Sequence, residues 1–104
     1  MITINGERWR INLVSPSHPY LMTPRGRRAW GVCDDITKGI YITNTLHPKQ
    51  LKKVLCHELV HASMYSYDVN ISDAEEELVA DLIATYGAEI ISNTNKAFNE
   101  IYPK

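Results

Sequence analysis

Residues 54–61 read Val-Leu-Cys-His-Glu-Leu-Val-His, in the middle of a stretch with a helical pattern. Its apolar residues recur at three- and four-residue spacing, as one face of an α-helix requires. These residues are Leu51, Val54, Leu55, Leu59 and Val60. Pro48 suits the first turn of such a helix, and we predict that the helix ends near Tyr67.

Two histidines in this helix are separated by one turn. His57 and His61 are four residues apart, so their side chains project side by side, and two imidazoles held in this way can bind one Zn²⁺ ion. Glu58 lies about 100° around the helix from His57, which suits a general base that accepts a proton from an attacking water molecule. The alternative is a pair of solvated histidines. The apolar neighbours disfavour it, because burying imidazoles without a partner is costly.

A second predicted helix follows, and its carboxylates can complete a metal site. Ser72 or Asp73 is expected to cap it, in a capping box with Glu75, and apolar residues continue to about Ile91 or further. Catalytic zinc sites usually have a third protein ligand. We assign this role to Glu77, which shares one helix face with the small side chains that would let two helices approach closely.

Asp81 is four residues from Glu77 on the same face. We predict that it accepts a hydrogen bond from the free N–H of a ligand imidazole, that of His57. Glu75 and Glu76 lie in the first turn, where carboxylates favour the helix dipole and can face water. Two other histidines, His18 and His47, are interpreted as surface residues rather than ligands.

The N-terminal half predicts a small sheet. Residues 1–14 alternate around Asn5-Gly6, which indicates a short hairpin or one edge strand. Residues 15–28 hold three of the five prolines and predict a loop. Residues 29–43 predict a second hairpin. We therefore expect an α+β fold in which a three-stranded, mostly antiparallel sheet packs on two main helices, and a polar tail over 92–104 anchored by Phe98 and Ile101.

Length and composition limit the class of protein. The 104 residues are expected to form a single domain, residues 1–104, of ordinary globular composition, 44% apolar and 22% charged. The formal charge of −1 argues against a uniformly basic nucleic-acid binder. No apolar run approaches a membrane span, and no secretory signal is visible. We expect a cytoplasmic protein in which Cys33 and Cys56 are reduced thiols.

Five arginines make the N-terminal third locally basic: Arg8, Arg10, Arg25, Arg27 and Arg28. The preferred interpretation is a solvated loop, and a contact to nucleic acid or to an acidic partner is the alternative.

The order His57-Glu58-x-x-His61, then Glu77-x-x-x-Asp81, resembles the gluzincin pattern of zinc metallopeptidases. Residues 28–92 also resemble small zinc-peptidase-like proteins encoded by phages and prophages, and more distantly the ImmA/IrrE-type metallopeptidases. This resemblance implies a minimal zincin-like domain that binds Zn²⁺, takes a protein or peptide substrate, and works in a bacterial host cell. It also implies that an edge strand of the 30–43 hairpin lines the cleft, with Trp30-Gly31-Val32 favoured.

The predicted function is that of a zinc-dependent peptidase with Glu58 as general base. The alternative is a catalytically weak phage or prophage protein that the metal stabilises and that acts by binding a protein partner. A His/His/Glu set also accepts other divalent ions. The candidates for stabilising an oxyanion are Tyr65, Tyr67, Tyr86 and His18, although the position of Tyr86 favours a core role.

Overall fold

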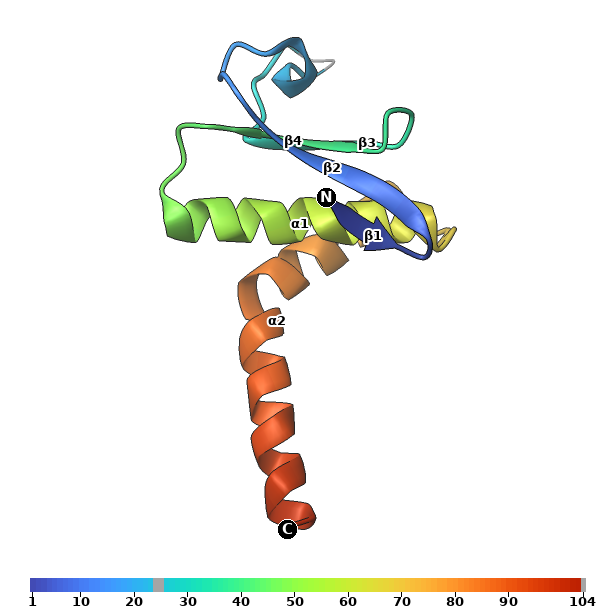
Figure 1. Ribbon diagram of the computed structural model, residues 1–104, viewed down its shortest axis with the longest axis vertical. Helices are drawn as coiled ribbons and strands as arrows, with labels where there is room; N and C mark the ends of the chain where they lie inside the picture. The colour runs from blue at the N-terminus through green and yellow to red at the C-terminus, as the bar shows by residue number, and fades with distance from the viewer. Residues whose placement is uncertain (24–25, 104) are drawn as a thin grey trace.

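The computed structural model describes residues 1–23 and 26–103. The elements are β1 (Ile2–Ile4), β2 (Glu7–Val14), the short 3₁₀ helix η1 (Pro19–Leu21), β3 (Gly31–Asp34), β4 (Gly39–Thr43), α1 (Pro48–Ser66) and α2 (Asp73–Ile101). The architecture is α+β, as predicted. The sheet lies along one side of α1, while α2 begins beside α1 and then runs away from the rest of the molecule (Figure 1).

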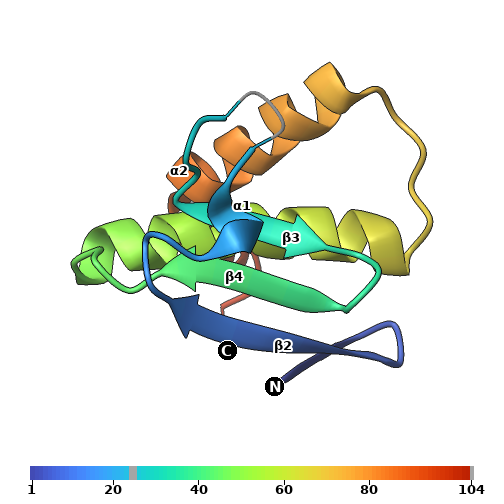
Figure 2. The same ribbon diagram turned by 90° about the horizontal axis from the view of Figure 1, so that it is seen from above.

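The sheet has four strands in the order β1-β2-β4-β3, and it is mixed, so the prediction of three mostly antiparallel strands is wrong. Each predicted hairpin is present: β1 pairs with β2 and β3 pairs with β4, both antiparallel. Asn5 and Gly6 have positive φ angles of 48° and 79° in the first turn. The two hairpins join through a parallel pairing of β2 with β4, which leaves β3 as an edge strand (Figure 2).

The core lies between the sheet and α1. Trp9 of β2, Ile40 and Ile42 of β4, and Ala62 of α1 are fully buried and form one cluster. Leu21 in η1 is also fully buried, so the proline-rich segment that was predicted as a loop contributes a core residue.

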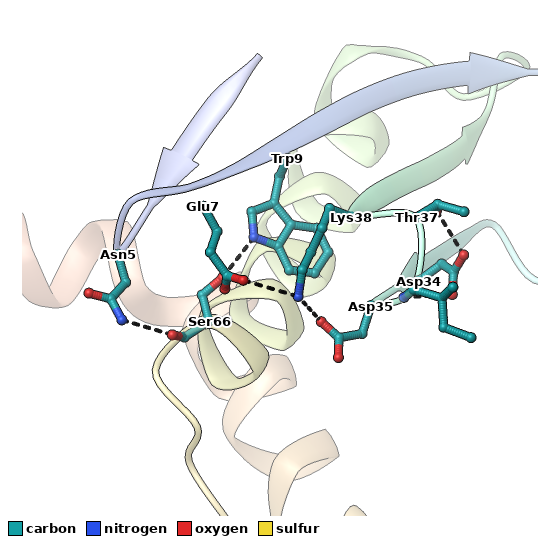
Figure 3. A network of polar contacts seen from close by, with 9 residues as sticks. Asn5, Glu7, Trp9, Asp34, Asp35, Thr37, Lys38 and Ser66 are labelled. Atoms are coloured by element: carbon teal, nitrogen blue, oxygen red, sulfur yellow. Dashed lines mark hydrogen bonds and ion pairs between the residues drawn. The ribbon is translucent and has the colours of Figure 1, made fainter.

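A polar network fixes the first hairpin to the C-terminal end of α1 (Figure 3). The indole N–H of Trp9 donates to Ser66 Oγ at 2.8 Å, and the Asn5 side chain donates to the Ser66 carbonyl at 2.9 Å. Lys38 bridges the two hairpins, because its ammonium group pairs with Glu7 at 3.3 Å and with Asp35. These contacts set the orientation of α1, and therefore of its histidines, relative to the sheet.

Helix α2 has two unlike parts. Ser72 caps it and forms the predicted capping box with Glu75, and Ala80 is its single buried residue. Residues 88–101, here called the arm, are exposed throughout and extend beyond the body (Figure 1). The polar tail was expected to be anchored by Phe98 and Ile101, and Tyr86 to lie in the core. Both expectations are wrong, since these side chains are exposed.

A search of the described ranges finds no helix that is both long and apolar enough to cross a membrane.

Candidate metal centre

Two helices bring three potential ligands together. α1 supplies His57 and His61, and the first part of α2 supplies Glu77, with one ligand atom from each lying within 4.8 Å of the others. The Glu77 carboxylate lies 3.2 Å from Nε2 of His57 and 2.9 Å from Nε2 of His61. The two Nε2 atoms are 3.1 Å apart. Residues predicted separately from two helices therefore meet at one point.

A further carboxylate holds the opposite side of each imidazole. Nδ1 of His57 lies 2.9 Å from Oδ1 of Asp81, the contact that the predicted supporting role needs. Nδ1 of His61 contacts Glu76 in the same way. The prediction that Glu76 faces water is wrong, because its side chain is largely buried against His61. The sequence carries one indication of this contact: Glu76 directly precedes Glu77, and adjacent residues of one helix can reach two neighbouring imidazoles.

These outer contacts suit a metal-binding tautomer of both imidazoles. A carboxylate accepts hydrogen bonds, so each Nδ1–H can donate outward, to Asp81 or to Glu76, and each Nε2 can then present its lone pair to a cation. Each Nε2 also lies within hydrogen-bond distance of a Glu77 oxygen. A cation held between the two Nε2 atoms and Glu77 would satisfy all three groups.

The residue types of this group suit zinc. Tetrahedral ligand bonds of about 2.0–2.1 Å separate neighbouring ligand atoms by about 3.3 Å, and the two Nε2 atoms are 3.1 Å apart. The Glu77 carboxylate faces both imidazoles, with Oε1 at 2.9 Å from Nε2 of His61 and Oε2 at 3.2 Å from Nε2 of His57. Two histidines with one carboxylate also form one of the ligand sets of catalytic zinc sites, in which a fourth position stays open. The ligand types and the distance between the two imidazoles therefore fit zinc.

Glu58 lies next to the ligands but points toward the sheet. Its side chain is only 7% exposed, and a Cβ at Gly31 would lie 3.1 Å from its Cγ and 2.7 Å from Cγ1 of Val54. Glycine at position 31 therefore lets the edge strand approach Glu58 closely. Burial raises the pKa of the Glu58 carboxyl above its ordinary value, and Glu77 acts in the same direction, while the two imidazoles oppose the shift.

Two hollows meet at Glu58 along the edge strand β3. One, of about 450 Å³, is lined by residues that include Trp30, Gly31, Lys53 and His57. The other, of about 340 Å³, is lined by residues that include Cys33 and His61. Glu58 lines both, and the two hollows together are here called the cleft. Trp30 and Gly31 of the favoured edge line the first hollow, while the role of this edge in binding a substrate stays a prediction.

The other residues named as candidates from the sequence lie in different parts of the structure. Tyr65 lines the hollow that contains His61 and Glu77, whereas Tyr67 lines an apolar groove on another part of α1. His18 caps η1 and its ring stacks on Tyr41, at 5.7 Å between centroids. His47 is exposed and precedes α1. Of the arginine cluster, Arg28 lines the cleft and Arg25 lies outside the described residues.

The two cysteines are free and occupy different settings. Cys56 lines the apolar groove of α1, in agreement with a packing role. Cys33 faces the cleft, where burial raises the pKa of its thiol to about 12, with a further contribution from Glu58. The thiol is therefore protonated at neutral pH, which makes it a poor nucleophile.

Comparisons of the chain with protein-family models, with curated proteins and with solved structures find no significant match.

Proposed function

We propose that this protein is a zinc-dependent peptidase whose metal is held by His57, His61 and Glu77. The observation that carries the proposal is the convergence of three potential metal ligands, with the Nδ1 side of each imidazole in contact with a carboxylate of α2. A structural metal needs no base beside it. Glu58, buried next to the ligands and lining the cleft, is therefore the feature that favours catalysis.

Each residue has a distinct part in hydrolysis. Zinc bound at this site would polarise the scissile carbonyl group and acidify a water molecule. Glu58 would accept the proton of the attacking water and return it to the leaving amine. Asp81 and Glu76 keep both imidazoles in the tautomer that presents Nε2 to the metal.

Tyr65 is the residue we assign to the developing oxyanion. It follows His61 by one turn of α1 and lines the same hollow as Glu58 and Glu77. Burial, chiefly, raises the pKa of its phenol, and acidic neighbours such as Glu76 contribute. The hydroxyl therefore keeps its proton at neutral pH and can donate a hydrogen bond.

The substrate proposed for this cleft is an extended peptide segment. Among the described residues β3 is an edge strand, so one side of its backbone has no strand partner there and can pair with an added strand. The first hollow combines Arg28 and Lys53 with Asp81, whereas the charged residues of the second include Asp73 and Glu76. A basic substrate side chain is therefore favoured at the second hollow.

The decisive variant is Glu58→Gln, assayed on a library of unstructured peptides with zinc-loaded protein. The amide keeps the shape of the side chain but cannot accept the proton, so we expect hydrolysis to fall by at least about 100-fold while zinc binding and thermal stability are unchanged. Glu75→Gln, an exposed residue of the cap, is the matched control and should keep full activity. Full activity of Glu58→Gln would contradict the assignment of the base.

A second candidate is a metal-stabilised protein that binds a partner without hydrolysis. The thin contact between the helices favours it, because Ala80 is the only buried residue of α2 and the metal site would join α2 to α1. In that case chelation would unfold the protein, and no substrate would be cleaved by any variant.

A further inference from the structure

The first hollow of the cleft offers more room than the attack of water on a carbonyl group requires. Its volume of about 450 Å³ lies within the range of sites that bind small molecules. His57, a proposed metal ligand, and Glu58, the proposed base, both line it. A substrate side chain that enters this hollow therefore lies next to the bond that is cleaved, and the other lining residues influence which side chain is accepted.

The exposed wall of the first hollow is mostly apolar. Its apolar lining residues are Trp30, Gly31, Val54 and Ala84. Trp30 is 58% exposed, whereas Trp9 is fully buried in the core. The fold therefore leaves the indole ring of Trp30 available at the wall of a concave surface. Aromatic and aliphatic side chains in such a setting are typical of ligand sites, and a second ring can pack on the first.

The charged residues that line the first hollow give no strong preference for a charged side chain. Arg28 donates to the carbonyl oxygen of Pro16 at 3.0 Å, and the Asp81 carboxylate contacts an imidazole of the metal centre at 2.9 Å. Arg28 and Lys53 carry two positive charges, and Asp81 and Glu58 carry two negative charges when ionised. Because these side-chain charges balance, the apolar wall decides which substrate side chain fits best.

Ala84 sets the size of the first hollow on the side of α2. It follows Asp81 by three residues and Glu77 by seven, so the three residues share one face of the helix. Only Asp81 and Ala84 of α2 are among the described residues that line the hollow. The carboxylate of Asp81 is engaged with His57, whereas Ala84 contributes a methyl group alone. A larger side chain at position 84 would fill the hollow without replacing any group at the metal centre.

We propose that the first hollow receives a large apolar side chain of the peptide substrate, above all an aromatic one, and that Trp30 and Ala84 determine this specificity. The inference rests on the peptidase function proposed above. The substrate ring would pack on the indole of Trp30, and the small side chain of Ala84 would leave room for it. Together with the acidic residues of the second hollow, this defines the substrate class as a peptide with a large apolar residue next to the cleaved bond and a basic residue nearby.

Two series of peptides, in which only the residue before or only the residue after the cleaved bond varies, test the specificity with zinc-loaded protein. In one series, phenylalanine should give a kcat/KM at least about 10-fold above that of alanine, because apolar pockets discriminate by about this factor for a single methylene. The ratio should fall toward one in Ala84→Leu, which fills the hollow, and in Trp30→Ala, which removes part of its wall. Ala88→Leu makes the first change at an exposed position one turn further along α2 and should keep the native ratio.

A binding experiment tests the first hollow without any hydrolysis. Benzyl alcohol carries an aromatic ring and has no bond that a peptidase cleaves. In two-dimensional proton–nitrogen NMR spectra of the zinc-loaded protein, millimolar benzyl alcohol should shift the indole signal of Trp30 and leave that of the buried Trp9 unchanged. The shift should be lost in Ala84→Leu and kept in Ala88→Leu. Thermal unfolding and zinc titration of each variant check that the fold and the metal centre are intact.

The two experiments separate the specificity from the peptidase function. Peptides that are cleaved without a preference for a large apolar residue, or with a preference for an acidic one, would overturn the inference and leave the function intact. A preference that stays unaltered in both Trp30→Ala and Ala84→Leu would overturn it as well, as would benzyl alcohol without effect on the Trp30 signal. Benzyl alcohol that binds beside Trp30 in a protein that cleaves no peptide would support the aromatic site and contradict the proposed function.

Discussion

The two parts of α2 belong to one continuous helix, yet only the first part packs against the rest of the described chain. The first part packs against α1 and holds Glu76, Glu77 and Asp81 against the two imidazoles. The arm makes no comparable contact, although Ile90, Ile91, Phe98 and Ile101 give it almost as many large apolar side chains per turn as the first part. Hydrophobicity alone therefore does not decide which part is packed. The small side chains of Ala80 and Ala84 explain why the first part packs, because they let neighbouring polar side chains such as Asp81 reach α1.

The largest expected contrast comes from enlarging one alanine in each part. Ala80 is fully buried between the helices, so Ala80→Leu should force them apart and destabilise the protein by about 1–3 kcal/mol. Ala88→Leu makes the same change at an exposed position at the start of the arm, where the effect should stay within about 0.5 kcal/mol. Urea unfolding measures both. Equal effects would mean that the two parts of α2 are packed alike.

Removing one carboxylate from each part should have the next largest effect. Glu76→Ala takes away the acceptor behind His61, so zinc affinity should fall about 10–100-fold with little change in fold. Glu89→Ala removes an exposed carboxylate from the arm and should leave the affinity unchanged. Competition titration against a zinc chelator gives both values. An unaltered affinity in Glu76→Ala would show that the contact does not orient the ring.

The smallest expected effect concerns the start of α2. Ser72→Ala removes the cap and should cost about 1 kcal/mol of stability. Hydrogen bonding to Ser72, first through its side chain and then through its backbone N–H, lowers the pKa of the Glu75 carboxyl. The stability that this hydrogen bonding contributes is therefore present above the ordinary pKa of a glutamate and is lost as pH falls through the lowered value. Thermal unfolding of Glu75→Gln against the native chain should show a difference at neutral pH that disappears in acid.

Sequence periodicity predicted both helices and the second hairpin, and it left the first as a hairpin or an edge strand, because each of these depends on neighbouring residues. The pairing of β2 with β4 escaped prediction, since alternation sets which face a strand buries but not which strand lies beside it. The burial of Leu21 escaped for a related reason: prolines indicate a break in regular structure, not exposure. Tyr86 and the anchors of the tail were placed in a core because apolar periodicity predicts a covered face without indicating what covers it.

The candidate site was predictable to the extent that helix geometry determines it. Four-residue spacing places His57 beside His61 and Glu77 beside Asp81, and the structure brings the two pairs together. Glu76 was missed because a carboxylate in a first turn has a sufficient explanation in the helix dipole. The buried setting of Glu58 depends on Gly31 in a different element, and the motif alone does not contain it.

The measurement that tests the central claim most directly is the metal content of protein purified without chelator or affinity tag. The account predicts about one zinc per chain, lost in Glu77→Ala and retained in Glu75→Ala, whose side chain serves only the helix cap. Native protein that is folded, contains no metal and does not bind added zinc would contradict it.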